Sequence, residues 1–171
     1  VDVTRLPVHG GSMRVFIRKA GAATPPSPEV IQMLAEEDAA GMNDAPAFEA
    51  FAARAHDVGE ALRKLLAELK AEGATIAGYG APAKGNTLLN FFDIGPETLD
   101  YLVDRNPLKQ GLLSPGKHIP IYDPAVLADD PPDYLLVLAW NFFDEIRTQL
   151  ADYEAAGGRF ILPLPYPRIV I

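Results

Sequence analysis

The segment Ala74-Thr-Ile-Ala-Gly-Tyr-Gly-Ala-Pro-Ala-Lys-Gly-Asn-Thr-Leu-Leu-Asn90 joins a short apolar run, a glycine loop and a helical pattern. Gly78 and Gly80 with Ala83 match G-x-G-x-x-[GA], a pattern that lets the backbone approach a pyrophosphate at a helix N-terminus. The motif of nucleotide hydrolases, G-x-x-x-x-G-K-[ST], is not met, because Lys84 precedes Gly85 instead of following it. The loop therefore permits a dinucleotide-type site. The alternative is that its glycines serve only a tight turn and close helix–strand packing.

Short apolar strands alternate with helices from this segment to the end of the chain. Strands are expected over 75–79, 99–103, 133–139 and 159–162, and helices over 83–93, 142–156 and a short stretch after Asp123-Pro124. This alternation is typical of parallel strands joined by right-handed crossovers. We therefore predict an α/β fold, with a Rossmann-like, mostly parallel sheet and flanking helices in a domain of residues 74–171.

Residues 1–73 carry a different pattern. A strand over 12–18 and a helix from its N-cap Ser27 to about Ala40 make an N-terminal arm and first helix, residues 1–43. Asp44 then caps a long amphipathic helix, residues 44–73, which Gly73 ends. The apolar residues of that helix recur at steps of three and four, which places one face against a core or a partner helix.

The composition excludes several classes of protein. With 49% hydrophobic residues among 171, the chain can bury a core, so it is not a disordered chain. No apolar run reaches the length of about 18 residues that a transmembrane helix needs, so no membrane partner is expected. The absence of cysteine rules out disulfides, thiolate metal sites and thiol nucleophiles in this chain.

The charge is negative overall but uneven. A net charge of −8 argues against nucleic acid as a partner, because phosphate binding needs a basic face. Acidic residues prevail in 29–72 and in the last third, whereas the four acidic and four basic side chains of 73–118 balance. The glycine-loop region and the N-terminal arm are therefore the parts where an anionic ligand is not repelled.

The segment Gly78–Asn90 resembles the signature loop of the C-terminal domain of S-adenosylmethionine-dependent sugar C-methyltransferases. These enzymes methylate carbon 3 of nucleotide-linked deoxysugars. Further agreement runs from about Leu6 to Arg168, in the segments 9–15, 103–111, 115–121 and 138–142.

The resemblance implies a three-part enzyme of which this chain is the last part. A zinc-binding domain and a domain that binds S-adenosylmethionine are expected upstream, outside this chain, and Val1 is interpreted as a cut. The implied partners are a nucleotide diphosphate sugar and the upstream methyl-donor domain, in a cytoplasmic enzyme. No catalytic residue is assigned to this chain, which is expected to be inactive alone, and its three scattered histidines do not predict a metal site.

Lys84 is the best cationic candidate for the diphosphate, and a solvated surface lysine is the alternative. Further contacts are expected from Asn86, Thr87, Asn90 and the loop residues Gly80, Ala81 and Gly85. Asp104, Asn106 and Lys109 follow the second strand and can hold sugar or ribose hydroxyls and a phosphate; alternatively, Asp104 and Asn106 organise the turn at Pro107.

Trp140 and Asn141 end the third strand, where the indole can stack on a base or sugar and the amide can hydrogen-bond it. Core packing of Trp140 with Asn141 as a helix N-cap is the alternative. His9 lies in a family-like motif and is either a substrate contact or a support for the turn at Gly10-Gly11.

Two other functions stay open from the sequence. One is an NAD(P)-binding Rossmann domain of an oxidoreductase, which the glycine spacing also permits. The other is a non-catalytic Rossmann-like interaction module, whose long amphipathic helix makes an oligomer interface.

Overall fold

The computed structural model describes residues 1–8, 10–22 and 24–170, in two compact units, Val1–Ala55 and His56–Ile171. The division falls inside the long helix α2 (Ala45–Ala71). Within the described residues, no helix is both long and apolar enough to cross a bilayer.

The first unit is built on a hairpin. Strands β1 (Asp2–Leu6) and β2 (Ser12–Phe16) pair antiparallel, and helix α1 (Pro28–Ala39) follows. The predicted cap of α1 is confirmed, because the Ser27 hydroxyl accepts a hydrogen bond from the Val30 N–H and donates one to Asp2 at 2.8 Å. Strand β1 was not predicted, because Arg5 falls on the same face as Val3 and breaks the alternation of apolar residues.

The second unit holds a six-stranded sheet. Its strands are β3 (Ile76–Tyr79), β4 (Leu102–Val103), β5 (Ile121–Tyr122), β6 (Tyr134–Val137), β7 (Arg159–Leu162) and β8 (Arg168–Val170). The order is β5-β4-β3-β6-β7-β8, and every pair is parallel except β7–β8. This is the strand order of a Rossmann sheet and confirms the predicted α/β class. Two strands were not predicted: β5 has only two residues after Pro120, and β8 follows a proline-rich turn.

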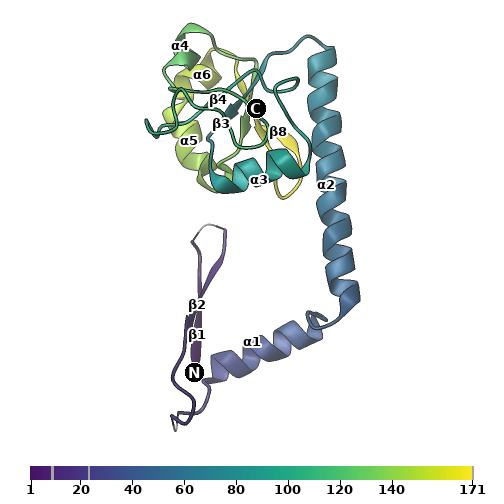
Figure 1. Ribbon diagram of the computed structural model, residues 1–171, viewed down its shortest axis with the longest axis vertical. Coiled ribbons are helices and arrows are strands. Elements are labelled where there is room, and N and C mark those ends of the chain that lie inside the picture. The colour runs from purple at the N-terminus through teal and green to yellow at the C-terminus, as the bar shows by residue number, and fades with distance from the viewer. Residues whose placement is uncertain (9, 23, 171) are drawn as a thin grey trace. The chain divides into compact units, whose positions relative to one another are not determined.

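Helices cover both faces of this sheet. One face packs against α2 and α3 (Ala83–Phe91), and the other against α4 (Val126–Asp129), α5 (Phe143–Gln149) and α6 (Ala151–Ala155). Figure 1 shows α4, α5 and α6 together on one side of the sheet. The prediction of a single helix over 142–156 is wrong. The backbone of Leu150 (φ −106°, ψ 27°) interrupts the helix between α5 and α6, while the side chain of Leu150 packs on the core.

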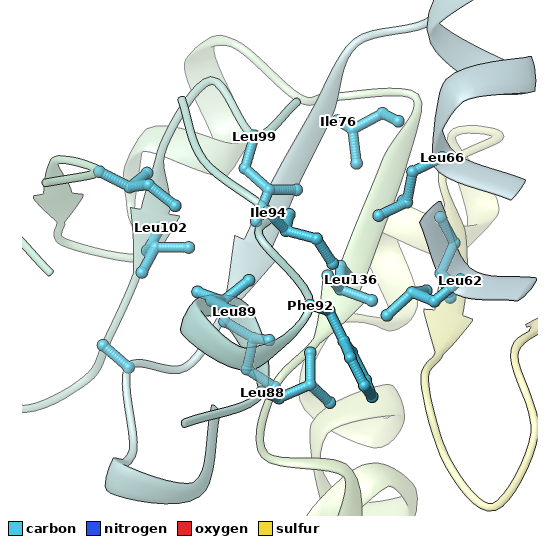
Figure 2. Packing of buried hydrophobic residues seen from close by; sticks show 14 of the residues in the cluster. Leu62, Leu66, Ile76, Leu88, Leu89, Phe92, Ile94, Leu99, Leu102 and Leu136 are labelled. Atoms are coloured by element: carbon cyan, nitrogen blue, oxygen red, sulfur yellow. The ribbon is translucent and has the colours of Figure 1, made fainter. Parts of the chain in front are cut away.

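The core on the α2 face explains the leucine spacing of the long helix. Leu62, Leu66 and Leu69 of α2 are buried in the same cluster as Ile76 and Leu136 of the sheet. Figure 2 shows Leu62 and Leu66 among the side chains of this cluster. The C-terminal part of α2 is therefore an integral layer of the second unit.

We expect Leu62→Ala to lower the free energy of unfolding by about 2–5 kcal/mol, because Leu62 is 0% exposed and its removal leaves a cavity. Urea unfolding followed by the emission of Trp140, which lies in the same unit, measures this loss. The control Leu108→Ala, at a side chain 82% exposed, should change the free energy by no more than about 0.5 kcal/mol. Equal effects of the two variants would contradict the assignment of this part of α2 to the core.

Candidate functional site

The glycine loop lies at the edge where the strand order reverses. The loop connects β3 to α3, and β3 stands between β4 and β6 in the sheet. The connection after β3 therefore crosses one face of the sheet, and the connection after β6 crosses the other face. A crevice opens between these connections at the carboxyl ends of the two strands. Open α/β sheets bind their ligands at this position.

Two glycines let the loop and α3 approach the end of β6. Gly80 has a φ of +89°, and a Cβ built on it would lie 3.2 Å from Ala139 Cβ. A Cβ on Gly85 would lie 2.8 Å from Leu138 Cβ, which is closer than real contacts allow. These two glycines therefore serve close helix–strand packing, which the sequence left open as an alternative. This packing brings α3 to the crevice.

Asp104 and Lys109 hold the loop from the side of β4. The Asp104 carboxylate accepts hydrogen bonds from the Ala81 N–H at 2.7 Å, the Asn106 N–H at 2.9 Å and the Lys109 ammonium at 2.8 Å. The same ammonium donates to the Ala81 carbonyl at 3.0 Å. We call Asp104, Lys109 and the Ala81 peptide groups the loop clamp. Its polar atoms are engaged with one another, so the predicted contacts of Asp104 and Lys109 with a ligand would have to compete with these bonds.

The loop clamp favours the ionised form of the Asp104 carboxyl. Burial alone would raise the pKa of the Asp104 carboxyl, but the hydrogen bonds from Lys109, Asn106 and Ala81 outweigh burial and hold that pKa below its usual range. Asn106 takes the turn-forming role left open by the sequence, because its side-chain oxygen accepts from the Leu108 N–H at 3.0 Å around Pro107.

The first turn of α3 presents backbone donors. Pro82 precedes the helix and gives it no side-chain cap, and the Asn86 N–H is bonded to the Pro82 carbonyl. The N–H groups of Ala83, Lys84 and Gly85 precede that bond, so they carry the positive end of the helix dipole. Lys84 belongs to this turn, and its ammonium lies 5.3 Å from the ring centroid of Trp140, in a cation–π contact.

The other polar residues of α3 divide between two tasks. Asn90 donates to the Pro115 carbonyl at 3.0 Å and to the Asn86 carbonyl, so it fastens the loop before β5 to α3. Thr87 donates to the Ala83 carbonyl at 3.1 Å. Asn86 donates to the Pro82 carbonyl at 3.2 Å, while its side-chain oxygen is buried and has no hydrogen-bond partner among the described residues. Among the described residues, the side-chain oxygen of Asn86 is therefore an unpaired acceptor in the first turns of α3.

Trp140 and Asn141 lie in a 3₁₀ turn, η1 (Trp140–Phe142), directly after β6. Trp140 is half-buried and packs against the clusters on both faces of the sheet. The alternative interpretation of Asn141 as the N-cap of the following helix is wrong, because that position is Phe142. The shift by one residue comes from the 3₁₀ turn, which the sequence pattern does not reveal.

Two hollows at the same edge are lined partly by residues that were not predicted as site residues. One, of about 280 Å³, is lined by residues that include Gly80, Phe142 and Ile146; the other, of about 330 Å³, by residues that include Gln110, Asp123 and Leu150. Both share Tyr79, Arg105 and Gln149. Arg105 was detectable from its place directly after Asp104. Gln149 was not, because its position depends on how α5 packs.

Among the described residues, no metal centre is found at this site. His9 lies outside the described residues, so its predicted substrate contact stays a prediction. His118 is exposed at a backbone φ of +56° in the loop before β5. In the part of the chain that the structure describes, no three His, Asp or Glu side chains gather closely enough to hold a metal ion.

Comparison with known proteins places this chain in a family. Residues 7–165 match the family model described as the C-methyltransferase C-terminal domain. A curated relative, C-methyltransferase NovU of Streptomyces niveus, is 42% identical over 170 residues, which are 99% of this chain and 40% of the relative. The chain therefore spans about two-fifths of the length of the relative that it matches.

The loop clamp predicts a specific pH dependence for Asp104→Asn. Because the pKa of Asp104 is depressed in the folded protein, its carboxylate stabilises the fold above the ordinary pKa of about 3.9. That stabilisation is lost as the pH falls through the lower folded pKa. We expect the variant to be less stable than the wild type at pH 7, and the difference to shrink below about pH 4.

Urea unfolding of both proteins between pH 2 and 7 measures this difference. The control Asp57→Asn, at an exposed position of α2, should stay close to the wild type throughout. A gap between Asp104→Asn and the wild type that is independent of pH would contradict the role of the charge.

Proposed function

Because the chain belongs to the family of C-methyltransferase C-terminal domains, we propose that it binds the sugar substrate of an S-adenosylmethionine-dependent C-methyltransferase. The substrate would be a nucleotide-linked deoxysugar that is methylated at carbon 3, next to a 4-keto group. The diphosphate would lie at the start of α3, and the sugar would face the domain that carries the methyl donor.

The observation that carries this proposal is the set of donors at the glycine loop. The N–H groups of residues 83–85 lie at a helix start, where an anion is stabilised. Lys84 of the same turn adds a cation, which lies 5.3 Å from the ring centroid of Trp140. Residues 73–118 are electrically balanced within a chain of net charge −8. A diphosphate therefore meets its attractive groups in a part of the chain that does not repel it.

The methyl donor is proposed to bind to an upstream domain. A Rossmann-type donor site needs a free carboxylate after the second strand to accept the ribose hydroxyls. Asp104 holds that position in this chain, but three hydrogen bonds within the protein engage its carboxylate. Asp104 is thus already committed to the loop clamp, and no step of methyl transfer is assigned to the described residues.

The part proposed for this chain is binding and orientation. Removal of a proton from carbon 3 requires a general base and a group that stabilises the enolate oxygen. Fixing the diphosphate at α3 would hold the sugar in one position relative to those groups, which lowers the entropic part of the barrier.

Calorimetric titration with thymidine diphosphate tests the proposal. We expect saturable binding, and we expect Lys84→Ala to raise Kd by about tenfold to hundredfold, because a charge-assisted hydrogen bond is lost. Lys64→Ala, at a side chain 78% exposed on α2, is the matched control and should leave Kd unchanged. Saturable binding of NADH without binding of thymidine diphosphate would overturn the proposal in favour of an oxidoreductase domain.

The single tryptophan offers a second, optical test. Since the Lys84 ammonium lies over the indole of Trp140, its transfer to a diphosphate should change the emission of that indole. Thymidine diphosphate should shift the emission of the wild type in the same direction as Lys84→Ala shifts it without ligand. A ligand that binds by calorimetry and leaves the emission unchanged would show that Lys84 does not move to it.

A further inference from the structure

The loop after β4, residues 104–120, holds α3 at both of its ends. At the first end, the loop clamp bonds the peptide groups of Ala81. At the other end, the Asn90 side-chain amide donates to the Pro115 carbonyl at 3.0 Å. Asn90 is seven residues after Ala83, so the second contact lies about 10 Å along the helix from its start. One loop therefore fixes two separate points of the same helix.

The contact at the far end of α3 has two further parts. The Lys117 ammonium forms an ion pair with the carboxylate of Asp93, which follows the helix. Gly116 has a φ of +80°, and a Cβ built on it would overlap the Asn90 side-chain oxygen. We call Asn90, Asp93 and the turn 114–119 the far latch. Only a glycine at position 116 lets this turn approach the helix so closely.

The turn of the far latch is anchored in the core. Ser114 is 1% exposed, and its hydroxyl oxygen accepts a hydrogen bond from the Ile119 N–H at 2.9 Å. The Ser114 N–H donates to the Ile119 carbonyl at 2.8 Å, and the His118 N–H donates to the Ser114 carbonyl at 2.9 Å. Ile119 itself is buried in the cluster on the α3 face of the sheet. The turn therefore offers Pro115 and Lys117 to α3 at a fixed place.

The backbone of the far latch is strained. Among the described residues, Asp93 and His118 are the non-glycine residues with a positive φ, 56° in each, and Lys117 precedes His118. The left-handed region is unfavourable for a residue with a Cβ, and such residues gather where function fixes the backbone. The Asp93 side chain is 79% exposed, so its ion pair contributes little to stability. A strained contact of little value to stability favours a role in positioning.

We propose that the far latch positions the anion site at the start of α3, and that Asn90, Asp93 and Lys117 act through the orientation of the helix without touching the ligand. The proposal rests on the proposed function, which places the diphosphate at that start. A short, hydrogen-bonded helix moves as one body, so a tilt at its far end re-aims its first N–H groups. Hydrogen bonds weaken steeply when they are misaligned. Asn90, which the sequence predicts as a ligand contact, takes an indirect role.

The test breaks the ion pair from each side in turn and measures the Kd for inorganic pyrophosphate by calorimetry, with the full 171-residue chain. Asp93→Asn and Lys117→Gln change the net charge in opposite directions. We expect both to raise the Kd by about threefold to tenfold, because both release the same end of α3. If Lys117 were itself a phosphate ligand, Asp93→Asn would free its ammonium and bind pyrophosphate more tightly.

Rescue and control variants separate positioning from charge. The exchanged pair, Asp93→Lys with Lys117→Asp, should recover most of the lost affinity. Asn90→Ala should weaken binding as the ion-pair variants do, and should shift the amide resonances of residues 83–85 in the ligand-free protein. The matched control Lys64→Gln breaks an exposed ion pair with Glu68 on α2, and should change neither the Kd nor these resonances.

The remaining outcomes count against defined parts of the proposal. An unchanged Kd in the latch variants overturns the far latch alone. Tighter binding by Asp93→Asn with weaker binding by Lys117→Gln makes the effect one of charge and overturns the far latch as well. A fall of the unfolding midpoint in parallel with the affinity would make the latch a structural element only. If the wild type binds neither pyrophosphate nor thymidine diphosphate, the proposed function and the far latch are overturned together.

Discussion

The loop clamp is the interaction on which the candidate site depends. Asp104 and Lys109, from the end of β4 and the loop after it, bond both peptide groups of Ala81. Ala81 is two residues before α3, so this clamp fixes where the helix begins and where its first N–H groups point. The residues that a sequence pattern assigns to a ligand thus serve first to shape the surface that a ligand meets.

The sheet makes this arrangement possible. Because β3 lies between β4 and β6, the clamp acts on the loop from one side and the end of β6 packs on it from the other. The leucines of α2 and α3 close one face of the sheet, and α4, α5 and α6 close the other. The carboxyl edge opens between the two helical layers, and the loop, Trp140 and the Arg105–Gln149 hydrogen bond lie there.

The fold was largely predictable from the sequence, and the site was predictable only in part. The α/β class and the cap at Ser27 follow from local patterns, and the resemblance to the C-methyltransferase domains is confirmed. Strands β5 and β8 are too short for an alternating pattern of apolar residues to be recognised in the sequence. The engagement of Asp104 with Lys109, and the place of Gln149 opposite Arg105, depend on contacts between distant elements, which no local pattern encodes.

The most direct measurement of the central claim is the shift of backbone amide resonances when thymidine diphosphate is added to the protein labelled with ¹⁵N. The account predicts that the amides of Ala83, Lys84 and Gly85 shift most, because their N–H groups would donate to the diphosphate. Saturable shifts that are confined to other elements and leave these three amides in place would contradict the assignment of the α3 start as the anion site.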